Sequence, residues 1–121
     1  MNILEKYQLS FYEYSFLNSK KKGCRSEQNV IHHTLGIFIS QIQDIDYIDA
    51  TLTAVNNVLS SAWPEADACA NDMIMAFIDP TTTKFCDVMG TPPDINNPDY
   101  VMPTTDFKEI LIEWKAFLKK S

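Results

Sequence analysis

Residues 73–78 read Met-Ile-Met-Ala-Phe-Ile, an apolar run that contains no charged or polar side chain. A run of this length predicts a β-strand, and apolar residues at every position are typical of a strand covered on both faces. Asp79-Pro80 predicts a turn, so residues 84–89 would return as a second strand. Residues 100–102 predict a short edge strand. The run at 73–78 therefore predicts the centre of a small antiparallel sheet.

Helices are predicted on both sides of this sheet in the sequence. Apolar residues at helical spacing predict one helix from about Ser26 to Gln43 and a second from about Asp46 to Ser61, with a short link between them. A third helix begins near residue 105, where Thr105 or Asp106 would be the N-cap and Glu109 the capping-box partner. Its predicted apolar face consists of Phe107, Ile110, Leu111, Trp114 and Leu118.

The segment from Tyr7 to Leu17 is rich in aromatic residues and fits two periodicities. Aromatic enrichment with partial alternation favours a strand, whereas apolar residues between Leu4 and Tyr14 also fit helical spacing. We favour the strand, and we predict a polar turn at residues 20–23. Together these elements predict a single α+β domain over residues 1–121, in which a small antiparallel sheet of the N-terminal segment, residues 73–78 and residues 84–89 packs against about three helices.

The composition excludes several classes of protein. The chain of 121 residues is 45% hydrophobic, which is typical of a globular domain and not of a disordered one. Its net charge of -6 argues against direct nucleic-acid binding, which needs a cationic surface. Three cysteines without a C-x-x-C pair indicate free thiols in a reducing cytoplasm, and no apolar run approaches the ~20 residues that cross a bilayer. We therefore expect a cytoplasmic protein that binds neither nucleic acid nor membrane.

The few residues that could carry chemistry are not arranged in a known motif. His32 and His33 are adjacent on a predicted helix, so they point about 100° apart and cannot easily share one ligand. Cys24 lies beside Arg25 and near three lysines, which makes it a better candidate for a reactive thiol than Cys69 among its acidic neighbours. No motif ties a histidine base to either thiol. We expect no enzymatic activity, no cofactor and no bound metal.

Charge is distributed unevenly along the chain. Residues 44–106 hold eleven acidic residues and one basic residue, Lys84, whereas the segments on either side each carry a net charge of +2. Such segregation is usual for a solvated face, but an acidic surface also attracts a basic partner. The candidate partner-binding residues combine the acids of the second helix and the following loop with one aromatic anchor: Asp44, Asp46, Asp49, Trp63, Glu65, Asp67 and Asp72.

Two parts of the chain resemble a known family. Residues 103–107 (Pro-Thr-Thr-Asp-Phe), Ile110-Leu111 and residues 113–118 (Glu-Trp-Lys-Ala-Phe-Leu) are similar to the ends of bacterial toxin-immunity proteins, and residues 11–16 resemble the starts of some of them. These are the immunity proteins of contact-dependent growth inhibition and related polymorphic toxin systems. The resemblance implies a cytosolic protein that binds and blocks one cognate toxin domain, one to one. Such toxins are often nucleases, whose cationic active sites would suit an acidic inhibitor.

Two alternatives from other classes stay open at this point. The first is a small-molecule-binding or regulatory α+β domain without catalysis, with its pocket between the helix pair and the sheet. The second is a hydrolase that uses a carboxylate pair such as Asp67 and Asp72. A basic polypeptide that co-purifies one to one would favour the inhibitor, and a retained small ligand would favour the first alternative.

Overall fold

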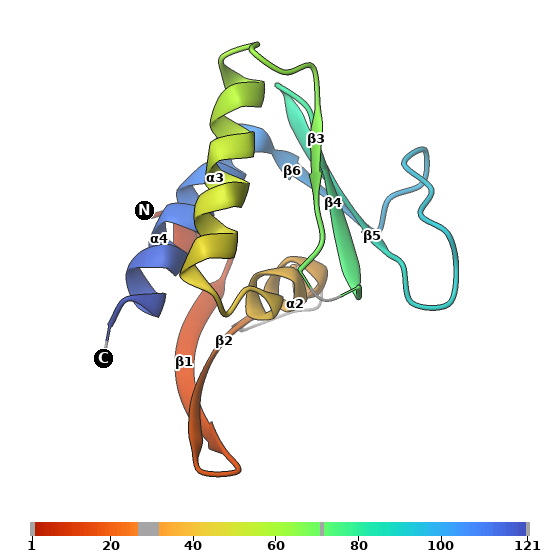
Figure 1. The fold of residues 1–121 in the computed structure, drawn as a ribbon. Coiled ribbons are helices and arrows are strands. Elements are labelled where there is room, and N and C mark those ends of the chain that lie inside the picture. The colour runs from red at the N-terminus through yellow and green to blue at the C-terminus, as the bar shows by residue number, and fades with distance from the viewer. Residues whose placement is uncertain (1, 27–31, 71, 121) are drawn as a thin grey trace.

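The computed structural model describes residues 2–26, 32–70 and 72–120 (Figure 1). Its elements in chain order are α1 (Ile3–Lys6), β1 (Leu9–Phe16), β2 (Ser19–Ser26), α2 (His33–Gln41), α3 (Ile45–Leu59), β3 (Ala66–Ala68), β4 (Ile74–Ile78), β5 (Thr82–Asp87), β6 (Tyr100–Pro103) and α4 (Thr104–Leu118). The described strands form two antiparallel sheets, a ribbon of β1 and β2 and a sheet in the order β3-β4-β5-β6. The predicted α+β class, with antiparallel strands packed against helices, is confirmed.

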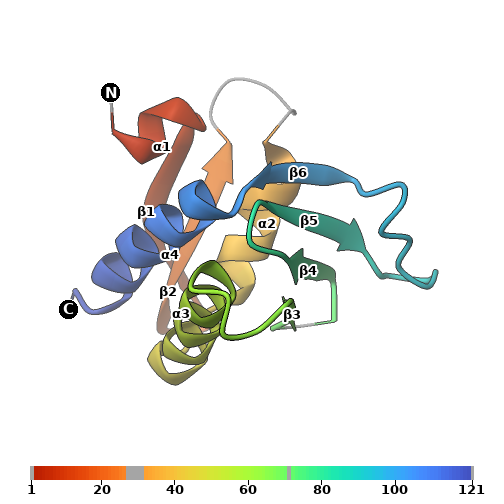
Figure 2. The ribbon, with the colours of Figure 1, turned by 90° about the horizontal axis from the view of Figure 1, so that it is seen from above.

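The helices α2, α3 and α4 lie on one side of the four-stranded sheet, and no described helix covers its other side (Figure 2). Strand β4 shows the consequence, because Ile74, Ala76 and Ile78 are buried while Met75 and Phe77 between them are only half-buried. The prediction that this strand is covered on both faces is therefore wrong. The reason is that α2, α3 and α4 all pack on the same face of the four-stranded sheet, which leaves no described helix to cover the other face. We call the uncovered side the outer sheet face.

The core lies between the sheet and these helices. The rings of Phe38, Phe85 and Phe107 pack together with centroids 5.2–5.8 Å apart. Trp114 of α4 is completely buried, and its indole N–H donates a hydrogen bond of 2.7 Å to the carbonyl of Ile42. The apolar face predicted for the last helix is confirmed, since four of its residues are fully buried and Leu118 is partly buried against them.

The prediction that the N-terminal segment joins the sheet of residues 73–78 and 84–89 is wrong, because β1 pairs with β2 in a separate two-stranded ribbon. Leu17 and Asn18 connect its strands with φ values of 51° and 63°, which is the signature of a type I′ hairpin turn. The strand favoured for this segment is confirmed from Leu9, but the polar turn predicted at residues 20–23 is wrong, because these residues belong to β2. Packing explains the glycine at position 23, since a Cβ there would collide with the ring of Tyr12.

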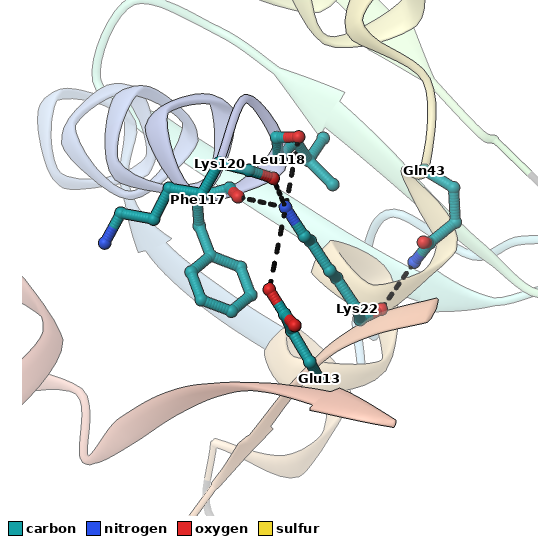
Figure 3. Close-up of polar contacts among 6 residues, drawn as sticks. All are labelled: Glu13, Lys22, Gln43, Phe117, Leu118 and Lys120. Atoms are coloured by element: carbon teal, nitrogen blue, oxygen red, sulfur yellow. Dashed lines mark hydrogen bonds and ion pairs between the residues drawn. The ribbon is translucent and has the colours of Figure 1, made fainter. Parts of the chain in front are cut away.

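Lys22 fixes the base of this ribbon to α4 (Figure 3). Its ammonium group donates hydrogen bonds to three carbonyls, those of Phe117 (2.6 Å), Leu118 (3.2 Å) and Lys120 (2.5 Å). Carbonyls at the end of a helix lack intrahelical partners, and the helix dipole favours a cation there. The amide of Gln43, in the link between α2 and α3, donates to the carbonyl of Lys22 at 2.7 Å. One lysine therefore joins the ribbon, α4 and the helix link.

Two helix starts differ from the prediction. Ser26 ends β2, and α2 begins at His33; the expected helical residues 27–31 lie outside the described residues. Helix α4 begins at Thr104 without a side-chain cap. The predicted capping box is wrong because Asp106 lies inside the helix, where its carboxylate accepts from the hydroxyl of Tyr7 at 2.6 Å and the ammonium of Lys6 at 2.9 Å. None of the helices in the described ranges is long and apolar enough to span a membrane.

Candidate binding face

One residue from each strand forms a row across the outer sheet face. The register pairs Asp67 of β3 with Phe77 of β4, Phe77 with Lys84 of β5, and Lys84 with Val101 of β6. Directly paired residues share a face of the sheet, and side chains alternate along each strand. Since the adjoining residue Ala76 is buried beneath the helices, these four side chains point away from them. The row thus places an aromatic ring between a carboxylate and an ammonium group.

A cavity of about 450 Å³ opens on this face. It is lined by residues of three strands and of the three connections α3–β3, β4–β5 and β5–β6: Glu65, Ala66, Asp67, Phe77, Ile78, Asp79, Lys84 and Ile95. Three carboxylates and a single ammonium group therefore surround an apolar centre. The ion pairs among the described residues join other groups, so no cationic nitrogen there lies within 4.0 Å of the carboxylates of Glu65 or Asp67. We call this site the acidic cavity.

Asp79 is held at the edge of the acidic cavity by the turn between β4 and β5. One of its carboxylate oxygens accepts hydrogen bonds from the backbone N–H groups of Thr81 (2.8 Å) and Thr82 (2.7 Å). This arrangement is the Asx turn that Asp favours before Pro and Thr. The turn fixes the position of the third carboxylate of the cavity.

The structure brings some of the predicted partner-binding residues together. Glu65 and Asp67 both line the acidic cavity, and Trp63 precedes Glu65 by two residues on the loop before β3. Trp63 is 44% exposed, as an aromatic anchor for a partner would need to be. Trp63 and Glu65 lie in the predicted loop after the second helix, but the prediction that Asp67 belongs to this loop is wrong, because residues 66–68 pair with β4 as strand β3.

The other predicted acids lie elsewhere. Asp44 caps α3 by accepting from the backbone N–H of Asp46 at 3.1 Å, and both are exposed in the described surface. Asp49 pairs with Lys115 of α4 at 2.5 Å, so its charge already has a cation beside it. Asp72 is exposed immediately before β4, with a φ of 55°. The helix start and the acidic cavity are therefore two separate acidic regions.

The predicted partner-binding residues include only Glu65 and Asp67 of the eight that line the acidic cavity, and Phe77, Asp79, Lys84 and Ile95 are among those missed. Phe77 was assigned to a doubly covered strand, because an apolar run does not reveal which face will be left open. Lys84 was noted only as the single base in an acidic stretch. The available signal was the number of helices, since three amphipathic helices cover one face of a sheet and leave the other to a partner or to solvent.

Two of the thiols, Cys24 and Cys86, and one of the histidines, His32, are engaged in packing. Burial raises the pKa of the Cys24 thiol to about 12, and burial also raises the pKa of Cys86. The prediction that Cys24 is the more reactive thiol is therefore wrong, because a buried thiol resists ionisation. His32 Nδ1 lies 2.6 Å from the Tyr100 hydroxyl, and burial lowers the pKa of this histidine. Within the described ranges, no three His, Cys, Asp or Glu side chains are placed to hold a metal ion.

A second cavity of about 350 Å³ lies between α2 and β2. Tyr12 and Arg25 line it from the ribbon, and His33, Ser40 and Gln41 line it from the helix. The side-chain oxygen of Gln41 is buried there without a hydrogen-bond partner among the described residues. A ligand in this cavity would be expected to supply a hydrogen-bond donor.

No family model matches the chain, and no curated protein or solved structure is significantly similar to it. Fold and site geometry are accordingly the basis of the functional conclusion.

Proposed function

We propose that this protein is a stoichiometric inhibitor of the immunity class, which binds one basic toxin domain in the cytoplasm through its outer sheet face. The observation that carries the proposal is the acidic cavity, where three carboxylates and one ammonium group, that of Lys84, surround Phe77 and Ile95, and where no ion pair between described residues engages Glu65 or Asp67. An apolar centre with a polar rim is typical of a protein–protein interface. The same face is the side of the sheet that the described helices leave open.

The chemistry of the acidic cavity suits a protruding arginine or lysine. The aliphatic stem of such a side chain would pack on Phe77 and Ile95, and its charged head would bind Glu65 and Asp67. Nuclease domains display such cations to hold phosphates. An inhibitor that binds these cations would compete with the nucleic acid, and it would do so without any catalysis of its own.

The charge distribution supports fast association with such a partner. Eleven acids stand against one base between residues 44 and 106, so the approaching toxin meets a predominantly negative surface. Electrostatic steering of this kind raises association rates and rejects partners of like charge. Salt should slow association, because the Debye length shrinks from ~10 Å at 0.1 M to ~3 Å at 1 M.

The test is a binding measurement with the toxin domain encoded by the neighbouring gene. The double variant Glu65→Lys/Asp67→Lys should weaken binding by ~10-fold or more, since it places like charges against a desolvated cation. The control is Glu109→Lys/Glu113→Lys, the same change of charge at two exposed positions of α4. Equal affinities of both variants would remove the acidic cavity from the interface, and no binding by the wild-type protein would refute inhibition of that toxin.

A second candidate function, small-molecule binding, is favoured by one observation. Gln41 lines the cavity between α2 and β2, and its buried side-chain oxygen has no hydrogen-bond partner in the described part of the chain. Native mass spectrometry of the purified protein is the test. A retained small molecule that is lost in Gln41→Leu would support this candidate, whereas a mass equal to that of the bare chain would count against it.

A further inference from the structure

The distal half of the ribbon exposes large apolar side chains. Tyr14 is 46% exposed, Phe16 61% and Leu17 84%, and all three lie beyond the point where Lys22 fixes the ribbon to α4. Figure 1 shows this part of β1 and β2 projecting away from the rest of the molecule. These side chains are not needed for the core, so their exposure calls for an explanation outside the fold.

The backbone of the turn at the end of the ribbon is a second unusual feature of Leu17. Leu17 adopts a φ of 51°, in the left-handed region that costs a non-glycine residue stability and where Asn or Gly is preferred. A leucine here strains the backbone and remains in water, so it contributes nothing to the stability of the described fold. A role in binding would account for both features.

Two lysines give the same part of the ribbon a positive charge. Lys21 pairs with Tyr14 and Lys20 with Ser15, and both lysines are exposed. Glu13, the nearest acid of β1, is 4.0 Å from the ammonium of Lys22. We define the ribbon tip as Tyr14, Phe16, Leu17, Lys20 and Lys21. It is a cationic, apolar projection on a protein whose net charge is -6.

The chemistry of the ribbon tip selects among three kinds of partner. An anionic bilayer attracts a protein by about 1 kcal/mol for each lysine near its surface, so the two lysines of the tip would bind it only weakly. Nucleic acid requires many phosphate contacts, for which the tip has too few cations. An acidic protein surface with an apolar centre complements the tip in both charge and hydrophobicity. The acidic cavity of this chain is such a surface.

We propose that the ribbon tip of one molecule docks in the acidic cavity of a second copy. Leu17 and Phe16 would meet Phe77 and Ile95, and the lysines of the tip would face Glu65 and Asp67. The contact is intermolecular, because Lys22 anchors the ribbon on α4 so that its tip points away from the sheet (Figure 1). The two surfaces differ, so the association is head-to-tail and closes into a ring or extends as a chain.

This self-association uses the cavity that the proposed function assigns to a toxin. A bound toxin would therefore dissociate the oligomer. In the absence of toxin, the ribbon tip of another copy would cover the acidic cavity. The self-association can be tested on the protein alone, so its failure is distinct from a failure of toxin binding.

The first experiment is sedimentation velocity of the wild-type chain from about 10 μM to about 1 mM, the range expected for a small interface. The average mass should rise above 13.8 kDa with concentration. Leu17→Asn should weaken association by ~10-fold or more, because a buried leucine is lost, while its thermal midpoint stays at or above the wild-type value. The control Ile112→Gln removes another exposed apolar side chain, on α4, and should associate as the wild type does.

The second experiment exchanges the charges. Lys20→Glu/Lys21→Glu makes the tip acidic, and Glu65→Lys/Asp67→Lys makes the cavity basic, so each variant alone should be monomeric. Mixing them restores opposite charges at both contacts and should restore association. A wild-type chain that stays monomeric at about 1 mM, a Leu17→Asn variant that associates normally, or a mixture that remains monomeric would each overturn the proposal.

Discussion

Replacing Lys22 with methionine removes the contact that holds the ribbon on α4. Methionine keeps a flexible side chain of similar length but donates no hydrogen bond, so three helix-end carbonyls lose their cationic donor. A hydrogen bond to a charged group contributes about 1.5–3 kcal/mol. The Lys22 side chain is 15% exposed, so water can reach these carbonyls and replace part of the loss. We expect the free energy of unfolding to fall by about 2–3 kcal/mol, a large share of the ~5–15 kcal/mol of a small domain.

Urea unfolding followed by far-ultraviolet circular dichroism measures this change directly. The matched control is Lys21→Met, the same substitution at the neighbouring position of β2, whose side chain is exposed on the opposite face of the ribbon. That variant should stay within about 0.5 kcal/mol of the wild type. If the two variants lose the same free energy, Lys22 does not anchor the ribbon and the reasoning is wrong.

Three further predictions concern stability. Trp114→Ala removes a fully buried indole and its hydrogen bond to a backbone carbonyl, so denaturant unfolding should show a loss of about 3–5 kcal/mol; an unchanged midpoint would contradict its burial. Burial alone would raise the pKa of the Asp106 carboxyl, but hydrogen bonds from two side chains lower it overall. Its contribution to stability is therefore present above the unfolded pKa of 3.8 and lost as the pH falls below it, and thermal midpoints measured against pH should show a smaller acid loss in Asp106→Asn. Cys24→Ser places a hydroxyl in a buried site and should cost about 1–3 kcal/mol, whereas Cys69→Ser should be nearly neutral; equal thermal midpoints for these two variants would show that Cys24 is accessible.

The elements that sequence periodicity predicted best are those with one apolar face. Helices α3 and α4 were placed within a few residues, because burial on one side imposes a regular pattern on the chain. Strand β4 was placed as closely from its uninterrupted apolar run, which does not show which face is buried. The ribbon turn was misplaced because Leu17 and Asn18 lack the glycine that marks such turns, and lysines with a glycine imitate one nearby. The glycine at position 23 is explained by a contact instead of a turn, because the ring of Tyr12 on the neighbouring strand leaves no room for a Cβ. Local sequence alone does not show such a contact.

The candidate site was predictable in charge but not in geometry. Acid density indicated Glu65 and Asp67, which line the acidic cavity. It also indicated Asp49, whose neutralisation by Lys115 depends on the packing of two helices. The position of Phe77 between Asp67 and Lys84 follows from strand register, which a single sequence does not specify.

The contacts between the N-terminal segment and α4 impose an order on folding. Lys6 and Tyr7 bond to Asp106 near the start of this helix, and Lys22 bonds to carbonyls at its end, all across 95–100 residues of sequence. At roughly 5–20 residues per second, synthesis of the intervening chain takes several seconds or more. The ribbon is made before α4 and is secured only when this helix arrives, so during that interval Phe11 lacks its contacts with Trp114 and Phe117.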